Sequence, residues 1–163
     1  MEMNQTQAYL TAIGGVKRVM AVRLKPKSDM LKSLEDACRE HGIQNGVIMS
    51  GIGGVTTAVF CDPQYFPCRK QPYNYGEPIV MHEVLSIAAV SGIICHDSEG
   101  EINLHVHVTF SDQRGRCFAG HLKEGTITML TVDCVIAEVG DGLVMSRQFD
   151  PELEVPLFTP VQE

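Results

Sequence analysis

The sequence has no tryptophan, and aromatic residues make up only 6% of its 163 residues. It also has no apolar run near the roughly 20 residues that a membrane-spanning helix needs, so we expect no membrane partner. The first residues, MEMNQTQAYL, lack the basic and then apolar regions of a secretory signal. These absences predict a globular protein in the cytoplasm.

Paired cysteines are also missing. The six cysteines are spread along the chain with no C-x-x-C spacing, which argues against a cysteine-rich zinc site. In a reducing compartment, such thiols behave as small buried apolar residues. The even number would permit three disulfides as an alternative, which the lack of a secretory signal disfavours.

Basic residues are few. Lys and Arg number 13 against 20 Asp and Glu, which gives a net charge of −7. Because DNA affinity comes largely from phosphate neutralisation by Lys and Arg, this charge disfavours DNA as a partner without excluding it. The short basic clusters at 23–27, 68–70 and 113–116 are expected to be solvated turns.

One segment has a clear helical period. Leu31, Leu34 and Cys38 fall on one stripe of an amphipathic helix predicted over about 29–41. Ser28 is the expected N-cap, and Gly42 is the expected stop.

Most of the remaining chain has strand composition. Strands are expected near 16–24, 46–50, 55–61, 79–95, 102–110, 116–122, 126–139 and 143–149. A turn is expected at GIGG (51–54), a long surface loop over 62–78 and an extended tail over 149–163. The run 79–95 is expected to form one strand, or two joined by a bend at Gly92. The predicted fold class is α+β: one domain, 1–163, with a mostly antiparallel, strongly curved sheet and one helix.

Three of the six histidines lie close together in sequence. His105 and His107 are two residues apart, so on a strand they share a face. If Phe110 pairs with Arg116 around the loop SDQRG, His105 lies opposite His121. Three imidazoles would then converge and leave one coordination position open, as in a catalytic-type zinc centre.

This pattern predicts Zn²⁺ at His105, His107 and His121, with another divalent transition metal as an alternative. The competing interpretation is that these histidines are ordinary polar strand residues. The preceding strand should place Ser91 and Ala89 opposite His105 and His107, and these small residues would leave a cavity above the metal.

The ordered segments HEVLSIAAVSGII, LHVHVTFSD, GHL and IAEV resemble the PPC domain (plants and prokaryotes conserved) over about 16–148. The usual GGHL of this family is AGHL here, with Ala119 in place of a glycine. The resemblance is to a stand-alone bacterial-type member. It implies an α+β fold, a homotrimer and, as in some relatives, metal ligation by His105, His107 and His121.

In plant relatives this domain accompanies AT-hooks and acts in transcriptional regulation. The segment RGRC (114–117) lacks the proline of such a hook. Stand-alone proteins of this kind are labelled as DNA-binding chiefly because of that association. Since function belongs to sites and not to folds, the label transfers only weakly to this chain.

Three functions remain open. The first is a metal-binding module or sensor of unassigned role, with a small-molecule ligand at the metal pocket. The alternatives are a DNA-binding or transcription-associated regulator, and a zinc-dependent hydrolase. Glu83 is the leading carboxylate for a hydrolase, although a surface ion pair is an equal explanation for it. Tyr73 and Tyr75 could line the pocket from the long loop.

Overall fold

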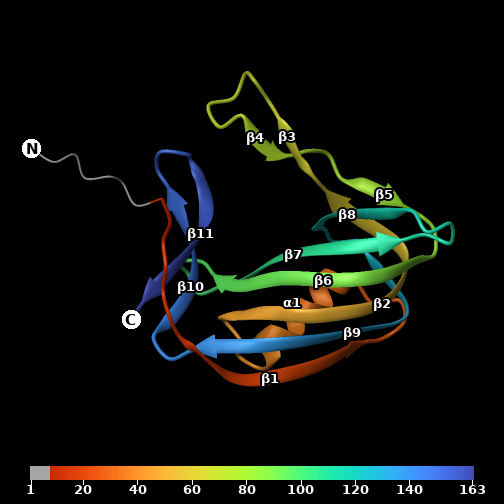
Figure 1. Cartoon of the computed structure of the whole chain (residues 1–163), viewed down its shortest axis with the longest axis horizontal. Helices are drawn as coiled ribbons and strands as arrows, with labels where there is room; N and C mark the ends of the chain where they lie inside the picture. The colour runs from red at the N-terminus through yellow and green to blue at the C-terminus, as the bar shows by residue number, and fades with distance from the viewer. Residues whose placement is uncertain (1–7) are drawn as a thin grey trace, which may run out of the picture.

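The structure, a computed structural model, describes residues 8–163 and contains one helix and eleven strands there (Figure 1). They are β1 (Gly15–Leu24), α1 (Met30–Glu40), β2 (Gly46–Cys61), β3 (Pro63–Tyr65), β4 (Tyr73–Tyr75), β5 (Ile79–Met81), β6 (Leu85–His96), β7 (Ile102–Ser111), β8 (Cys117–Leu122), β9 (Ile127–Gly140), β10 (Leu143–Asp150) and β11 (Val155–Gln162).

Nine strands form one strongly curved sheet in the order β1-β9-β2-β8-β7-β6-β10-β11, with β5 paired to β2. The curvature arises at β2, which pairs with β6 in two stretches, at residues 46–48 and 53–55, and with β8 at its end. Because β6, β7 and β8 also pair in sequence, these four strands close on one another. The pairings are antiparallel except at Ser146 and His96. A mostly antiparallel, strongly curved sheet with one helix is therefore confirmed.

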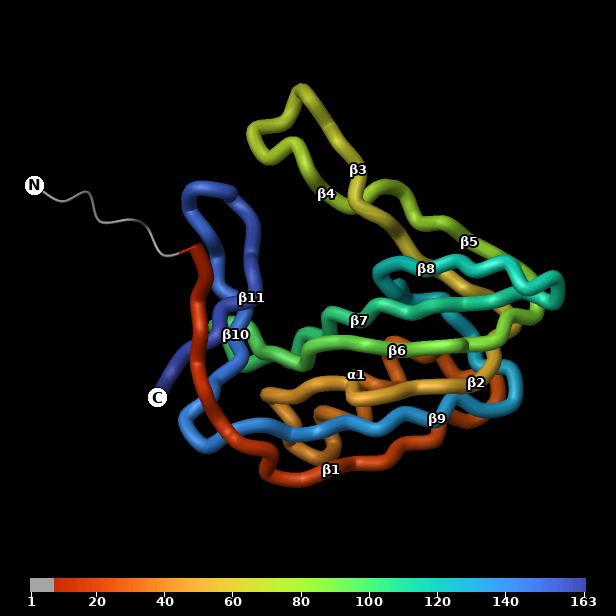
Figure 2. Tube along the Cα trace, in the orientation of Figure 1, coloured from red at the N-terminus to blue at the C-terminus, as the bar shows by residue number. Residues whose placement is uncertain are grey.

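The helix α1 lies across the concave side of the sheet (Figure 2). Met30, Leu34 and Cys38 are fully buried, so the apolar stripe begins at Met30, whereas Leu31 is only partly buried. The predicted N-cap was wrong by one residue. Asp29 caps the helix by accepting the Lys32 amide at 3.1 Å, whereas the Ser28 hydroxyl donates to the Lys25 carbonyl.

The two faces of strand β7 differ: one packs into the core and the other carries the histidines. Its even-numbered residues from Leu104 to Phe110 are buried, whereas His107 is exposed and His105 is half-buried. Burial of each large apolar side chain contributes about 1.5–3 kcal/mol. A one-residue slip would bring histidine into the core, so this alternation fixes which face carries the imidazoles.

The turn predicted at GIGG is wrong, because β2 runs unbroken through residues 51–54. These glycines allow close packing within the strand. A Cβ at Gly51 would lie 2.6 Å from a methyl of Val90, and Gly53 has a φ of 152° beside a register shift. Glycine here permits bulges in a bent strand and does not reverse the chain.

The long apolar segment 79–95 also divides differently from the prediction. It breaks at residues 82–84 into β5 and β6, and Gly92 lies inside β6 with no bend. A Cβ on Gly92 would lie 2.8 Å from the His105 carbonyl oxygen, so glycine serves strand pairing at this position.

Two segments expected to be irregular contain paired strands. The loop 62–78 contains the small β3–β4 sheet, and the tail 149–163 contains β11, which pairs with β10 along its whole length. Both hairpins project from the same side of the sheet (Figures 1 and 2). Over residues 8–163, no helix combines the length and apolarity needed to cross a bilayer.

Candidate metal centre

His105, His107 and His121 lie on the sheet face opposite α1. The first two come from β7 and the third from the neighbouring strand β8. The predicted register was wrong by two positions: His121 lies opposite His107 and not opposite His105. An even shift keeps every side chain on its face, so the histidines still converge.

Asp112 accounts for the shift. Its carboxylate accepts the backbone N–H groups of Arg114 and Arg116, both at 2.9 Å, and the Arg116 guanidinium at 2.6 Å. This local bonding, typical of aspartate in turns, starts the loop at Asp112 and extends β7 to Ser111. The loop is therefore one residue later than the predicted SDQRG.

The neighbouring pairing with β6 is shifted in the same way. Ser91 lies opposite His107, and Ile93, rather than Ser91, lies opposite His105. The expected small residue is thus present beside His107 only, and the side of the cluster next to His105 is more apolar than predicted.

The imidazoles are close enough to share one ion. One ligand nitrogen from each histidine lies within 4.8 Å of the other two, and the Nε2 atoms of His105 and His107 are 3.1 Å apart. In an ideal tetrahedral zinc site with Zn–N bonds near 2.0–2.1 Å, ligand nitrogens are about 3.3 Å apart. Nδ1 of His121 is buried and has no hydrogen-bond partner among the described residues. The donor set therefore fits a transition metal.

The surroundings favour neutral imidazoles. Burial, together with the positive charge of Lys123, lowers the pKa of His121 to about 4. Burial and then the neighbouring His107 also lower the pKa of His105. Both rings are uncharged at neutral pH, and the neutral ring is the form that binds metals.

Tyr75 on β4 covers the cluster. Its ring stacks on His121 with centroids 4.5 Å apart and planes inclined by 19°, and its hydroxyl lies 3.1 Å from Nε2 of His105. Burial raises the pKa of this phenol. The predicted long loop thus delivers Tyr75 to the site, whereas the Tyr73 ring packs against Tyr65 with the two planes inclined by 44°.

The other predicted candidate lies elsewhere. Glu83 is exposed in the connection between β5 and β6, outside the strand in which it was expected, and it does not belong to the three-histidine group. The sequence reasoning missed Arg147, a half-buried residue of β10 that donates to the Asn103 side chain at 2.8 Å. No local signal marks Arg147, because only tertiary folding brings β10 next to β6, where the Arg147 side chain reaches Asn103 on β7.

Known proteins are similar to this chain in sequence or in fold. A bifunctional protein GlmU from Synechococcus sp. is 30% identical over 137 residues, which are 84% of this chain and 20% of that protein. The chain thus spans about one fifth of the length of the curated relatives it matches.

A metal-containing protein from Archaeoglobus fulgidus has a similar structure, with a TM-score of 0.75 and 23% identity over 92% of this chain and 99% of that one. A protein from Bacteroides thetaiotaomicron, provisionally named as DNA-binding, has a TM-score of 0.72 and 23% identity over 89% of this chain and 96% of that one. At these identities the two likenesses establish the fold.

Residues 5–140 match the Plants and Prokaryotes Conserved (PCC) domain, the family that the sequence motifs resemble. The match contains the H-x-H pair of β7, His121 and the strands that position them. The chain therefore belongs to the Plants and Prokaryotes Conserved domain family.

Proposed function

We propose that this PCC-domain chain binds one Zn²⁺ through His105, His107 and His121 and works as a metal-dependent binding module or sensor. The observation that carries this proposal is the convergence of three ligand nitrogens within 4.8 Å. The name of the metal-containing relative from Archaeoglobus fulgidus supports it.

The donor set selects the metal. Three imidazoles suit zinc and other late transition metals better than Mg²⁺ or Ca²⁺, which prefer oxygen ligands. A zinc ion held by three histidines keeps a position for an exogenous ligand and can lower the pKa of bound water to about 7. Within residues 8–163, no carboxylate joins the three-histidine group, and we therefore favour a binding role over a hydrolytic one.

Metal content tests the proposal. The chain is purified without a histidine tag, reconstituted with zinc, desalted and measured by inductively coupled plasma mass spectrometry. We expect about one zinc per chain in the wild type and none in His107→Ala or His121→Ala. His41→Ala, at the end of α1, is the matched control and should retain zinc.

Retention of zinc by both site variants, or its absence from the reconstituted wild type, would refute the metal site. Circular dichroism spectra of all variants separate loss of a ligand from loss of folding.

We also propose a homotrimer, which the family resemblance implies. Large apolar side chains on β1 and β2 support association, because Val19 is 57% exposed, Met49 61% and Ile52 62%. Light scattering after size exclusion should give about 54 kDa, three times 17.9 kDa. A mass of one chain would contradict the trimer.

A DNA-binding regulator is the second candidate, and the provisional name of the Bacteroides relative supports it. The charges oppose it: the net charge is −7, and six of the 13 Lys and Arg side chains already form ion pairs with carboxylates. Affinity that falls steeply with salt in a DNA titration would favour this role.

A further inference from the structure

A cavity of about 670 Å³ lies beside the histidine cluster. Its floor is formed by β6 and β7, including Ile93 and His105, which lie opposite each other. Its walls come from the β3–β4 hairpin and from β11, which are the two segments that the sequence predicted as loop and tail. The volume lies within the range of small-molecule sites and far exceeds that of a single ion.

The cavity is mainly apolar but contains one strong charge. Arg147 is the one Lys or Arg among its lining residues. Nη1 of Arg147 donates to Oδ1 of Asn103 at 2.8 Å, and within residues 8–163 no carboxylate forms an ion pair with Arg147. A half-buried guanidinium with donors to spare favours an anionic partner.

An apolar surface adjoins this charge. Phe158 of β11 lies directly opposite Arg147 of β10, and Leu157 and Tyr73 also line the cavity. Phe158 is 39% exposed and Tyr73 67% exposed, so their rings retain uncovered surface. An occupant that meets both features has an anionic end and an apolar body.

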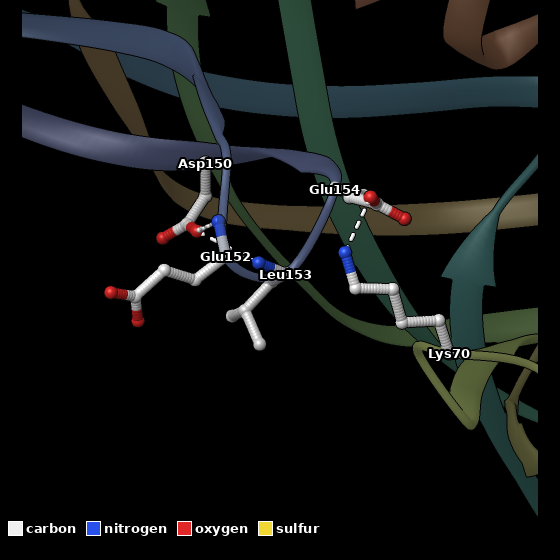
Figure 3. Close-up of polar contacts among 5 residues, drawn as sticks. All are labelled: Lys70, Asp150, Glu152, Leu153 and Glu154. Carbon is white, nitrogen blue, oxygen red and sulfur yellow. Dashed lines mark hydrogen bonds and ion pairs between the residues drawn. The ribbon is translucent and has the colours of Figure 1, made fainter.

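Charged side chains join the two walls at their tips. Lys70, between β3 and β4, forms an ion pair with Glu154 in the turn between β10 and β11 (Figure 3). In the same turn, Asp150 accepts the backbone N–H groups of Glu152 and Leu153, each at 2.9 Å. The hairpins are thus tied together around the cavity by exposed groups, while Arg147 stays free for a ligand.

We propose that this cavity binds a small organic monocarboxylate with an apolar or aromatic body, held by Arg147 and packed against Phe158, Leu157 and Tyr73. A single guanidinium, already bonded on one side to Asn103, matches one carboxylate better than the multiple charges of a phosphate. The site extends the proposed metal function, because it assigns a ligand class to the space next to the histidines.

The anion site is close to the metal centre but separate from it. Asn103, which holds Arg147, and His105 are two residues apart on β7, a rise of about 7 Å. The carboxylate can therefore reach Arg147 whether or not the histidines hold zinc, while the rest of the ligand lies near His105.

Binding of 2-naphthoate by isothermal titration calorimetry tests the proposal, with the uncharged 2-naphthamide as its matched control. We expect naphthoate to bind wild type with a dissociation constant below about 1 mM. Arg147→Gln should weaken naphthoate about ten- to a hundredfold and leave naphthamide unchanged, since only the carboxylate uses the charge. Arg39→Gln, on the exposed face of α1, should bind like wild type.

Failure of naphthoate to bind wild type, or equal affinity for naphthoate and naphthamide, would overturn the proposal. Both comparisons use the wild type and stand even if Arg147→Gln does not fold. Repeating the titration with His107→Ala, which should lack zinc, separates the two sites, because this variant should still bind naphthoate. In the wild type, naphthoate binding without zinc refutes only the metal, and zinc binding without naphthoate binding refutes only this site.

Discussion

Truncation of Tyr75 separates two contributions to metal binding that one side chain makes. Tyr75→Phe removes only the hydroxyl, which lies 3.1 Å from Nε2 of His105, and keeps the ring stacked 4.5 Å from His121. Tyr75→Ala removes both. The hydroxyl occupies the Nε2 atom of His105 that would bind zinc, so at the proposed site Tyr75→Phe should not weaken zinc binding, whereas Tyr75→Ala also loses the stacked ring and should bind zinc more weakly than Tyr75→Phe.

The structure gives the sign of each effect. Nε2 of His105 cannot bind both the Tyr75 hydroxyl and zinc, so Tyr75→Phe should keep or raise the affinity for zinc. Loss of an aromatic stacking pair costs about 0.5–1.5 kcal/mol, so Tyr75→Ala should bind zinc about two- to thirteenfold more weakly than Tyr75→Phe.

Competition for zinc against a chromophoric chelator measures these constants. Tyr73 supplies the matched controls, because it lies on the same strand but packs against Tyr65 and is 67% exposed. Tyr73→Phe and Tyr73→Ala should keep wild-type affinity. Equal zinc affinities of Tyr75→Phe and Tyr75→Ala would refute the reasoning, as would the same difference between Tyr73→Phe and Tyr73→Ala.

Three further predictions concern the elements around the histidine cluster: the β7–β8 loop, β6 and the helix α1. Burial raises the pKa of Asp112, but hydrogen bonds from Arg116 outweigh this effect and hold the pKa below its usual 3.8. The stabilising contribution of the carboxylate is therefore present above about pH 4 and is lost as the pH falls through the folded-state pKa. The urea midpoints of wild type and Asp112→Asn should differ at pH 7 and converge in acid. Gly92→Ala places a Cβ within 2.8 Å of the His105 carbonyl oxygen, so it should lower the free energy of unfolding by about 1–3 kcal/mol and weaken the affinity for zinc. Unchanged values of both quantities would contradict this packing. Leu34→Ala, in the buried stripe of α1, should lower the free energy of unfolding in urea by about 2–5 kcal/mol and still leave about one zinc per folded chain. Loss of zinc from the folded variant would contradict the separation of core and site.

Local patterns in the sequence predicted much of this architecture. The 3.6-residue period located α1, and the alternation of apolar residues located β7, with His105 and His107 on one face. The side-chain period of a strand is a property of the backbone itself, so two residues of spacing suffice to place both imidazoles together. His121 joined them despite the wrong register, because the error was an even number of residues.

Tertiary contacts decided the rest. Side-chain bonds of Asp112 set the hairpin register, and pairing with β6 and β9 keeps β2 one unbroken strand through glycines that look like a turn. Tyr75 and Arg147 reach the histidine face from segments 30 residues before and 42 residues after His105. The local sequence determined which side chains lie on each face of a strand. Pairing between distant strands, which no local period encodes, determined which other residues contact that face.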